Sequence, residues 1–132
     1  MDPLFHFAST AVVLPFGIKY LSKPALVGFF LSAAFLDIDH YFFYIYKFKH
    51  LGLKKAWQFY QSIRHQPKKV FCFFHTIEFL LLIIFLNLVM KTQFFYGFLI
   101  GLIFHLLIDL AQAIYYQEVN YRFWSFWQYL FK

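Results

Sequence analysis

The sequence has few of the residues on which a soluble protein of its length depends. Only 14% of the 132 residues are charged, only six are acidic, and Cys72 is the single cysteine. One cysteine excludes an internal disulfide and a cluster of several thiolates. The N-terminus reads Met-Asp-Pro and lacks the basic region of a secretory signal, so the first apolar segment is expected to be retained.

Hydrophobic residues are abundant instead. They make up 62% of the chain, and aromatic residues alone make up 27%, which is more than a soluble domain of this size can bury. A transmembrane helix needs about 20 mostly apolar residues. We therefore expect one all-α domain over 1–132, an integral membrane bundle of about four transmembrane helices, at 4–21, 24–46, 70–90 and 94–116.

Two further segments have an amphipathic pattern. In 53–64, Leu53, Ala56, Trp57 and Tyr60 recur at spacings of three and four, and 121–131 has a similar apolar stripe. This pattern is typical of short interfacial helices that lie in the headgroup layer. The basic and aromatic residues around them favour contact with anionic membrane lipids, and no nucleic-acid partner is expected.

The basic residues also predict an orientation. If four helices cross the bilayer, the N-terminus, the 47–69 connection and the C-terminal tail share one side, and Lys19, Lys23 and Lys91 lie on the other. By the positive-inside rule, the side that carries more basic residues is cytoplasmic. This predicts a multi-pass protein of the inner membrane with both termini inside. That side carries Lys47, Lys49, Lys54, Lys55, Arg64, Lys68, Lys69, Arg122 and Lys132.

Four of the six acidic residues fall inside the expected spans. Ionisable groups in hydrocarbon cost several kcal/mol unless they are paired, hydrated or bound to an ion, so their presence indicates function. Each of three acids has a histidine at helical spacing, which places the pair on one helix face. The pairs are Asp37 with His40, Glu78 with His75, and Asp109 with His105; the fourth acid is Asp39, and His6 is a further candidate.

The depth of these acids is similar. At about 1.5 Å of rise per residue, Asp37, Glu78 and Asp109 lie roughly 10 to 14 Å from the cytoplasmic ends of their helices. Carboxylates and imidazoles that converge from several helices favour a divalent-ion site, with a proton or cation pathway as the alternative. For His6 a packing role stays open, and His50 and His65 are expected to face solvent or headgroups.

Three segments together resemble a known family. FLDIDHYFF at 35–43, FHTIEFLL at 74–81 and GLIFHLLIDL at 101–110 resemble the membrane-bound metal-dependent hydrolases, small inner-membrane proteins with members described as LexA-binding. More remotely, the His-x-x-x-Asp pair resembles those of zinc-dependent phospholipases C and P1-type nucleases. Leu36 replaces the usual proline, and Phe74-His75-Thr76 replaces a Thr-His-Ser motif. The resemblance implies metal-binding roles for His6, Asp37, Asp39, His40, His75, Glu78, His105 and Asp109.

The resemblance and the depth of the acids together predict a membrane-embedded metal-dependent hydrolase. It would act on a lipid or lipid-linked phosphoester at the cytoplasmic leaflet. One to three divalent ions are expected, Zn²⁺ first and Mn²⁺ or Fe²⁺ as alternatives, with Glu78 or Asp39 as the base. Two other functions stay open: a cation- or proton-coupled transporter or channel, and a non-catalytic interaction protein whose helices an ion holds together.

Overall fold

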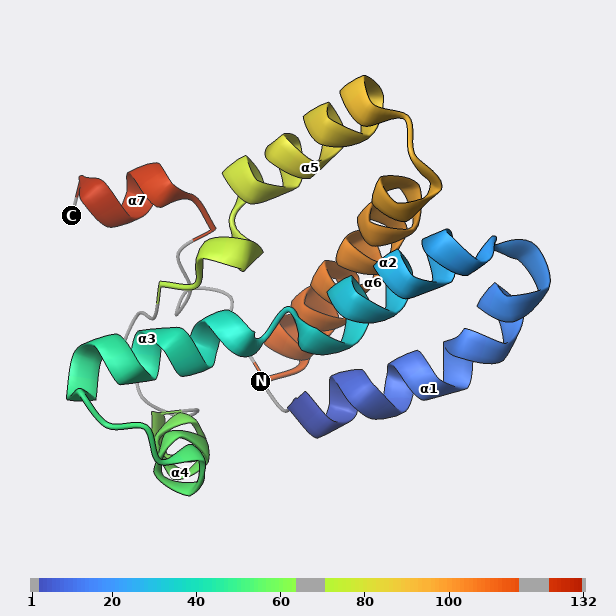
Figure 1. The fold of residues 1–132 in the computed structure, drawn as a ribbon. Helices are drawn as coiled ribbons and strands as arrows, with labels where there is room; N and C mark the ends of the chain where they lie inside the picture. The colour runs from blue at the N-terminus through green and yellow to red at the C-terminus, as the bar shows by residue number, and fades with distance from the viewer. Residues whose placement is uncertain (1–2, 64–70, 117–123, 132) are drawn as a thin grey trace.

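The computed structural model describes residues 3–63, 71–116 and 124–131, and every regular element in these ranges is helical (Figure 1). The all-α expectation is therefore confirmed. The elements are α1 (Pro3–Tyr20), α2 (Lys23–Phe35), α3 (Ile38–Phe48), α4 (Leu53–Ile63), the 3₁₀ turn η1 (Phe73–His75), α5 (Ile77–Met90), α6 (Gln93–Tyr115) and α7 (Phe126–Leu130). Outside the described residues lie His65, residues 121–123, Arg64, Lys68, Lys69, Arg122 and Lys132.

Helices α2 and α6 form the centre of the molecule and make its most extensive helix contact. Small residues allow their backbones to approach closely. A Cβ atom on Gly97 of α6 would lie 2.6 Å from the Cα of Ala25, and one on Gly28 of α2 would lie 2.8 Å from the backbone nitrogen of Phe98. Such close packing through small residues is the usual way in which helices associate in lipid.

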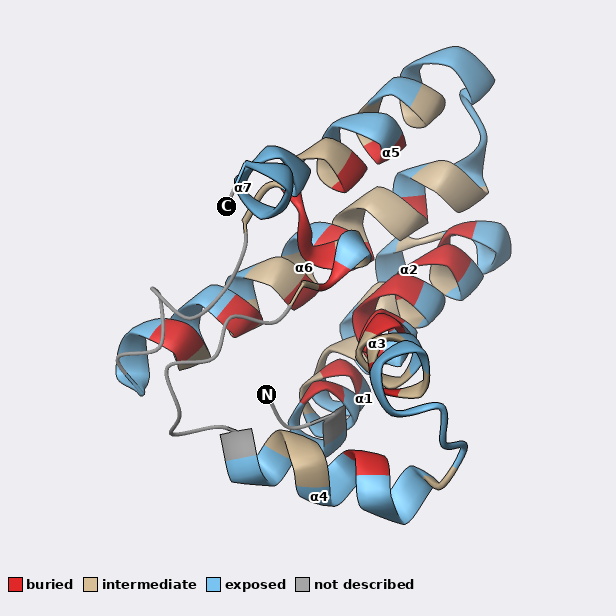
Figure 2. Ribbon diagram, turned by 90° about the vertical axis from the view of Figure 1, so that its left-hand side faces the viewer, coloured by how far each residue is buried: buried red, intermediate tan, exposed pale blue. Residues whose placement is uncertain are grey.

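The other helices flank this pair. Helix α1 packs on α2, and α5 packs on α6 through a cluster formed by Leu36, Phe79, Ile83 and Leu102. The buried residues lie on the faces that these helices turn toward one another, while the outer faces of α5 and α7 are exposed (Figure 2). The core is therefore a narrow layer around α2 and α6.

The segment 24–46, expected as one helix, forms α2 and α3, which are bent by 43° at Leu36 and Asp37. In a continuous helix, residues two positions apart lie on nearly opposite faces, so one of them would point away from the core. The break allows both Asp37 and Asp39 to be buried. In the expected span 70–90 the α-helix likewise begins only at Ile77, after η1.

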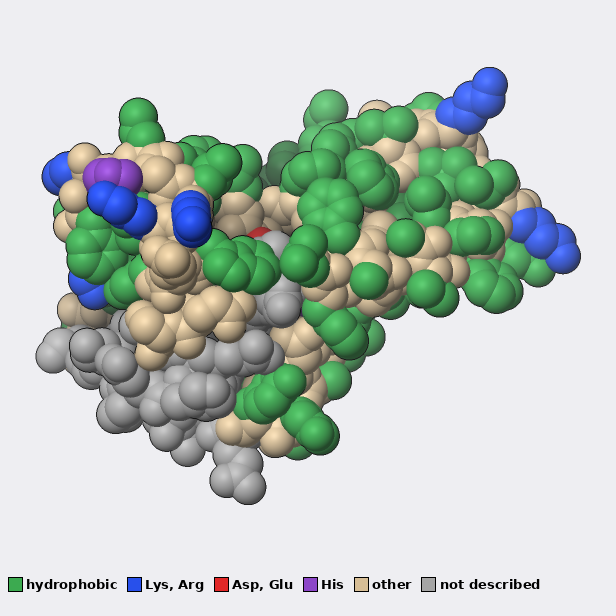
Figure 3. All heavy atoms as spheres, turned by 90° about the horizontal axis from the view of Figure 1, so that it is seen from below, with side chains coloured by type: hydrophobic (Ala, Val, Ile, Leu, Met, Phe, Trp, Pro, Cys, Tyr) green, Lys and Arg blue, Asp and Glu red, His purple; other side chains and the backbone are tan. Residues whose placement is uncertain are grey.

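Among the described helices, α6 alone is long and apolar enough to cross a membrane, and α2 with α3 passes the same test as a bent pair. Helices α1 and α5 are apolar but shorter, so the four-span bundle stays a prediction. Large hydrophobic side chains are exposed along the flanking helices, including Val12, Phe85 and Leu88. Seen from below, they cover broad areas between basic side chains at the two ends (Figure 3).

Candidate metal centre

Three segments that are distant in the sequence bring acids and histidines to one place. His6 comes from α1, Asp37 from the break before α3, and His105 and Asp109 from α6. These four residues, here called the inner set, each offer one ligand atom, and the atoms lie within 4.8 Å of one another. His6, His105 and Asp109 are fully buried and Asp37 is 9% exposed. The convergence that the sequence predicted for these residues is therefore present.

The contacts within the inner set are short. His6 Nε2 lies 2.9 Å from Asp109 Oδ1 and 3.8 Å from Asp37 Oδ2. His105 Nε2 lies 3.5 Å from Asp37 Oδ1 and 3.8 Å from Asp109 Oδ2, and its ring stacks on that of His6 with centroids 4.0 Å apart. Two carboxylates thus face two imidazole nitrogens across a small space.

His75, in η1, completes the wall of this space. Its Nε2 lies 3.3 Å from Asp37 Oδ1, 3.2 Å from Asp109 Oδ2 and 3.1 Å from His105 Nε2. Its Nδ1 points the other way and lies 3.1 Å from Asp39 Oδ2. Asp37 consequently contacts all four histidines of the cluster, since His40 Nδ1 lies 3.5 Å from its Oδ1.

Hydrogen bonds on the outer side orient two of these rings. His105 Nδ1 lies 3.0 Å from the carbonyl oxygen of Ala33, so it donates there and leaves Nε2 free to accept. In the same way, Asp39 Oδ2 accepts a hydrogen bond from His75 Nδ1, and it also accepts the Phe74 N–H at 2.9 Å. Metal-binding histidines are oriented in this way, with the second ring nitrogen bonded to a carbonyl or carboxylate.

The donor atoms of the inner set fit a divalent ion. Both ring nitrogens of His6 and both oxygens of Asp37 are buried, and within the described residues they make no hydrogen bond. Buried polar atoms without partners are costly, so such a group needs an explanation. Ligands at 2.0–2.1 Å around a tetrahedral Zn²⁺ are about 3.3 Å apart. The measured separations of 2.9–3.8 Å lie around this value.

A second group lies beside the first. Asp39, His40, Cys72 and His75, here called the outer set, also offer ligand atoms within 4.8 Å of one another. Cys72 was not among the predicted site residues, because a single cysteine was taken only to exclude a thiolate cluster. Its position three residues before His75 could have indicated it, because the η1 turn brings residues at this spacing close together.

Glu78, predicted as a ligand and as the base, is not brought together with the other predicted site residues and belongs to neither group. Its carboxylate accepts hydrogen bonds from the Ser125 hydroxyl and from the Phe126 N–H, at the start of α7. Asp39, the other predicted base, accepts from His40 and from His75. Outside the cluster, His50 is exposed and accepts the Gly52 N–H, as expected for a residue facing solvent or headgroups.

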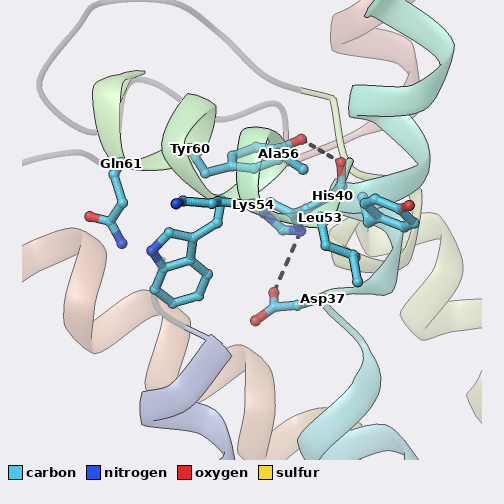
Figure 4. Close-up of a pocket in the computed structure, with 9 residues that line it drawn as sticks. Asp37, His40, Leu53, Lys54, Ala56, Tyr60 and Gln61 are labelled. Carbon is cyan, nitrogen blue, oxygen red and sulfur yellow. Dashed lines mark hydrogen bonds and ion pairs between the residues drawn. The ribbon is translucent and has the colours of Figure 1, made fainter. Parts of the chain in front are cut away.

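A cavity of about 400 Å³ opens onto the cluster between α3 and α4. Asp37 and His40 face one another at its inner side, while Lys54 and Gln61 of α4 line the opposite part (Figure 4). The Tyr60 hydroxyl donates to the His40 carbonyl oxygen at 2.6 Å and holds α4 against α3. A second cavity of about 280 Å³, lined mostly by apolar side chains, lies between α5 and α6 and reaches His75.

Three comparisons, with protein-family models, with curated proteins and with solved structures, found no match for this chain. The family resemblance therefore stays a prediction, and what the chain does must be argued from the geometry of the cluster and its cavities.

Proposed function

We propose that the chain is a membrane-embedded, metal-dependent hydrolase that acts on a lipid or lipid-linked phosphoester at the cytoplasmic leaflet. The observation that carries this proposal is the position of Asp37. It contacts all four histidines of the cluster and also lines the α3–α4 cavity. A ligand in that cavity would therefore meet an ion held by the inner set.

The residues of the chain have separate tasks in this proposal. His6, Asp37, His105 and Asp109 would hold the ion, with His75 Nε2 beside them. A divalent ion supplies Lewis acidity and, at neutral pH, an activated water. Asp39 and the Ala33 carbonyl hold the imidazole rings in place. Burial of the inner set excludes competing water and strengthens its electrostatic interactions.

Two features support a lipid as the substrate. The α3–α4 cavity carries Lys54, an exposed cation near the cluster, which would attract a phosphate group. The second cavity reaches the same cluster at His75 and is lined by Leu80, Ile103 and other apolar residues, which suits a hydrocarbon chain. Exposed apolar side chains on α5 and α6 suit contact with lipid and support a multi-pass protein of the inner membrane.

A non-catalytic role is the second candidate. Complete burial of His6, His105 and Asp109 also suits an ion that joins α1 to α6 without touching a substrate. A transporter is supported less well, because the acids gather at one level instead of following a path. The α3–α4 cavity favours hydrolysis over the non-catalytic role, since a purely structural ion needs no opening.

The first test is elemental analysis of the detergent-purified protein. We expect near-stoichiometric divalent metal in the wild type, loss in Asp109→Asn, and retention in Glu78→Gln as the matched carboxylate control. The second test is release of phosphate or headgroup from vesicles that contain anionic or neutral lipids. We expect metal-dependent release that Lys54→Ala weakens and Lys91→Ala, at the far end of α5, does not. Metal without release would favour the non-catalytic role, and a metal-free wild type would contradict both.

A further inference from the structure

The outer set contains a sulfur ligand, which distinguishes it chemically from the inner set. Asp39 and His40 come from the first turn of α3, and Cys72 and His75 come from the segment around η1. Cys72 is buried, with 6% of its surface exposed, and it forms no disulfide. Two imidazoles, a carboxylate and a thiol thus meet between the first turn of α3 and the η1 turn that precedes α5.

The atoms of the outer set are held around one point. Asp39 Oδ1 lies 2.8 Å from His40 Nδ1, and Asp39 Oδ2 lies 3.1 Å from His75 Nδ1. The backbone fixes the group from two sides, through the Phe74 N–H on Asp39 and the Tyr60 hydroxyl on the His40 carbonyl. Burial raises the pKa of the Tyr60 hydroxyl, and the nearby Cys72 sulfur adds to this effect. The outer set is therefore ordered before any ligand binds.

Four donors of these types make a known kind of ion site. Zn²⁺ binds cysteine, histidine and carboxylate ligands in tetrahedral sites, and a thiolate favours soft ions over Mg²⁺ or Ca²⁺. His75 links the two sets, because its Nε2 faces Asp37 and Asp109 while its Nδ1 faces Asp39. The two sets can thus share this ring.

We propose that Asp39, His40, Cys72 and His75 form a second ion site in which the Cys72 thiolate is a ligand. The chain then has two ion sites, one without a sulfur ligand and one with a sulfur ligand. The proposal extends the proposed function, since it assumes that the neighbouring inner set binds an ion. On binding, the Cys72 thiol and the His75 Nδ1–H release their protons to solvent, and the Cys72 sulfur, His75 Nδ1 and the Asp39 carboxylate that had accepted the Nδ1–H coordinate the ion. The site would prefer Zn²⁺ or Co²⁺ to Mg²⁺.

Cobalt provides a direct test in the full chain. The purified protein is stripped of metal and titrated with Co²⁺, and both ion content and near-ultraviolet absorption are measured. We expect two ions per chain in the wild type and a thiolate-to-cobalt charge-transfer band. Cys72→Ser should lose the band and one ion, and its remaining ion shows that the variant is folded. His6→Ala, the matched change in the inner set, should lose one ion and keep the band.

The possible failures are distinguishable. A wild type that binds one Co²⁺ without the band and still hydrolyses lipid would overturn the second site and leave the proposed function standing. A band that survives in Cys72→Ser would also overturn it. Binding of no ion at all would overturn the second site and the proposed function together.

Discussion

Replacement of Gly97 by alanine tests how strongly the packing of α2 on α6 controls the metal centre. The new Cβ would lie 2.6 Å from Ala25 Cα and closer still to its carbonyl oxygen, whereas ordinary contacts begin at 3.4 Å. Both obstacles are backbone, so the helices must separate by about 1 Å, and overpacking of this kind costs about 1–3 kcal/mol. His105 and Asp109 lie on the same helix as Gly97, so a shift of α6 would displace both side chains. We therefore also expect the affinity for a divalent ion to fall by about tenfold or more.

Gly17→Ala is the matched control. Its Cβ would meet the ends of the Leu26 and Leu21 side chains, at 3.2 and 3.7 Å, and both side chains can move. Both changes gain about 1 kcal/mol of helix propensity, so their difference isolates the clash. Thermal unfolding in detergent and ion titration measure the two effects. Equal stability and equal affinity in Gly97→Ala and Gly17→Ala would refute the close-packing argument.

Three further predictions follow from local contacts. Thr76→Ala removes the hydroxyl that accepts the Phe79 N–H at the start of α5, and should lower the free energy of unfolding by about 1 kcal/mol in a denaturant titration. Glu78→Gln should weaken the contacts with Ser125 and Phe126 and increase protease cleavage near α7, while the amount of bound metal stays the same. Loss of bound metal in this variant would indicate that Glu78 is a ligand. Acidification should release the ion, because protons compete with it for the imidazole nitrogens, and release that does not depend on pH would argue against histidine ligands.

The sequence correctly predicted which acids and histidines converge where the helices are regular. His105 and Asp109, four residues apart on α6, do face the same space. The argument from depth brought Asp37 and Asp109 together correctly, because α2 and α6 run side by side in the same direction, with Ala25 against Gly97 and Ala33 against His105. His6 joined them, although periodicity alone gave it no partner.

The prediction failed where the chain leaves helical geometry. His75 and Glu78 were paired by helical spacing, but His75 lies in η1 and Thr76 is extended, with ψ at 154°, before α5 begins. Glu78 therefore points toward α7. Spacing also could not show the bend that buries Asp37 and Asp39 together.

One signal for the fold went unused. Gly97 and Gly101 are four residues apart in an apolar helix, the spacing by which small residues let transmembrane helices pack closely. This pattern would have identified the face of α6 that meets α2. Cys72 was missed because a single cysteine was taken only to exclude a thiolate cluster, and because its partners come from a turn and from another helix.

The most direct test of the central claim is the X-ray absorption spectrum of the zinc-loaded Cys72→Ser variant, in which the second site has lost its sulfur ligand. If His6, Asp37, His105 and Asp109 hold an ion, the spectrum should contain nitrogen and oxygen ligands at about 2.0–2.1 Å with the multiple scattering of imidazole rings. A shell of oxygen alone, without imidazole scattering, would show that the ion binds elsewhere and would contradict the account.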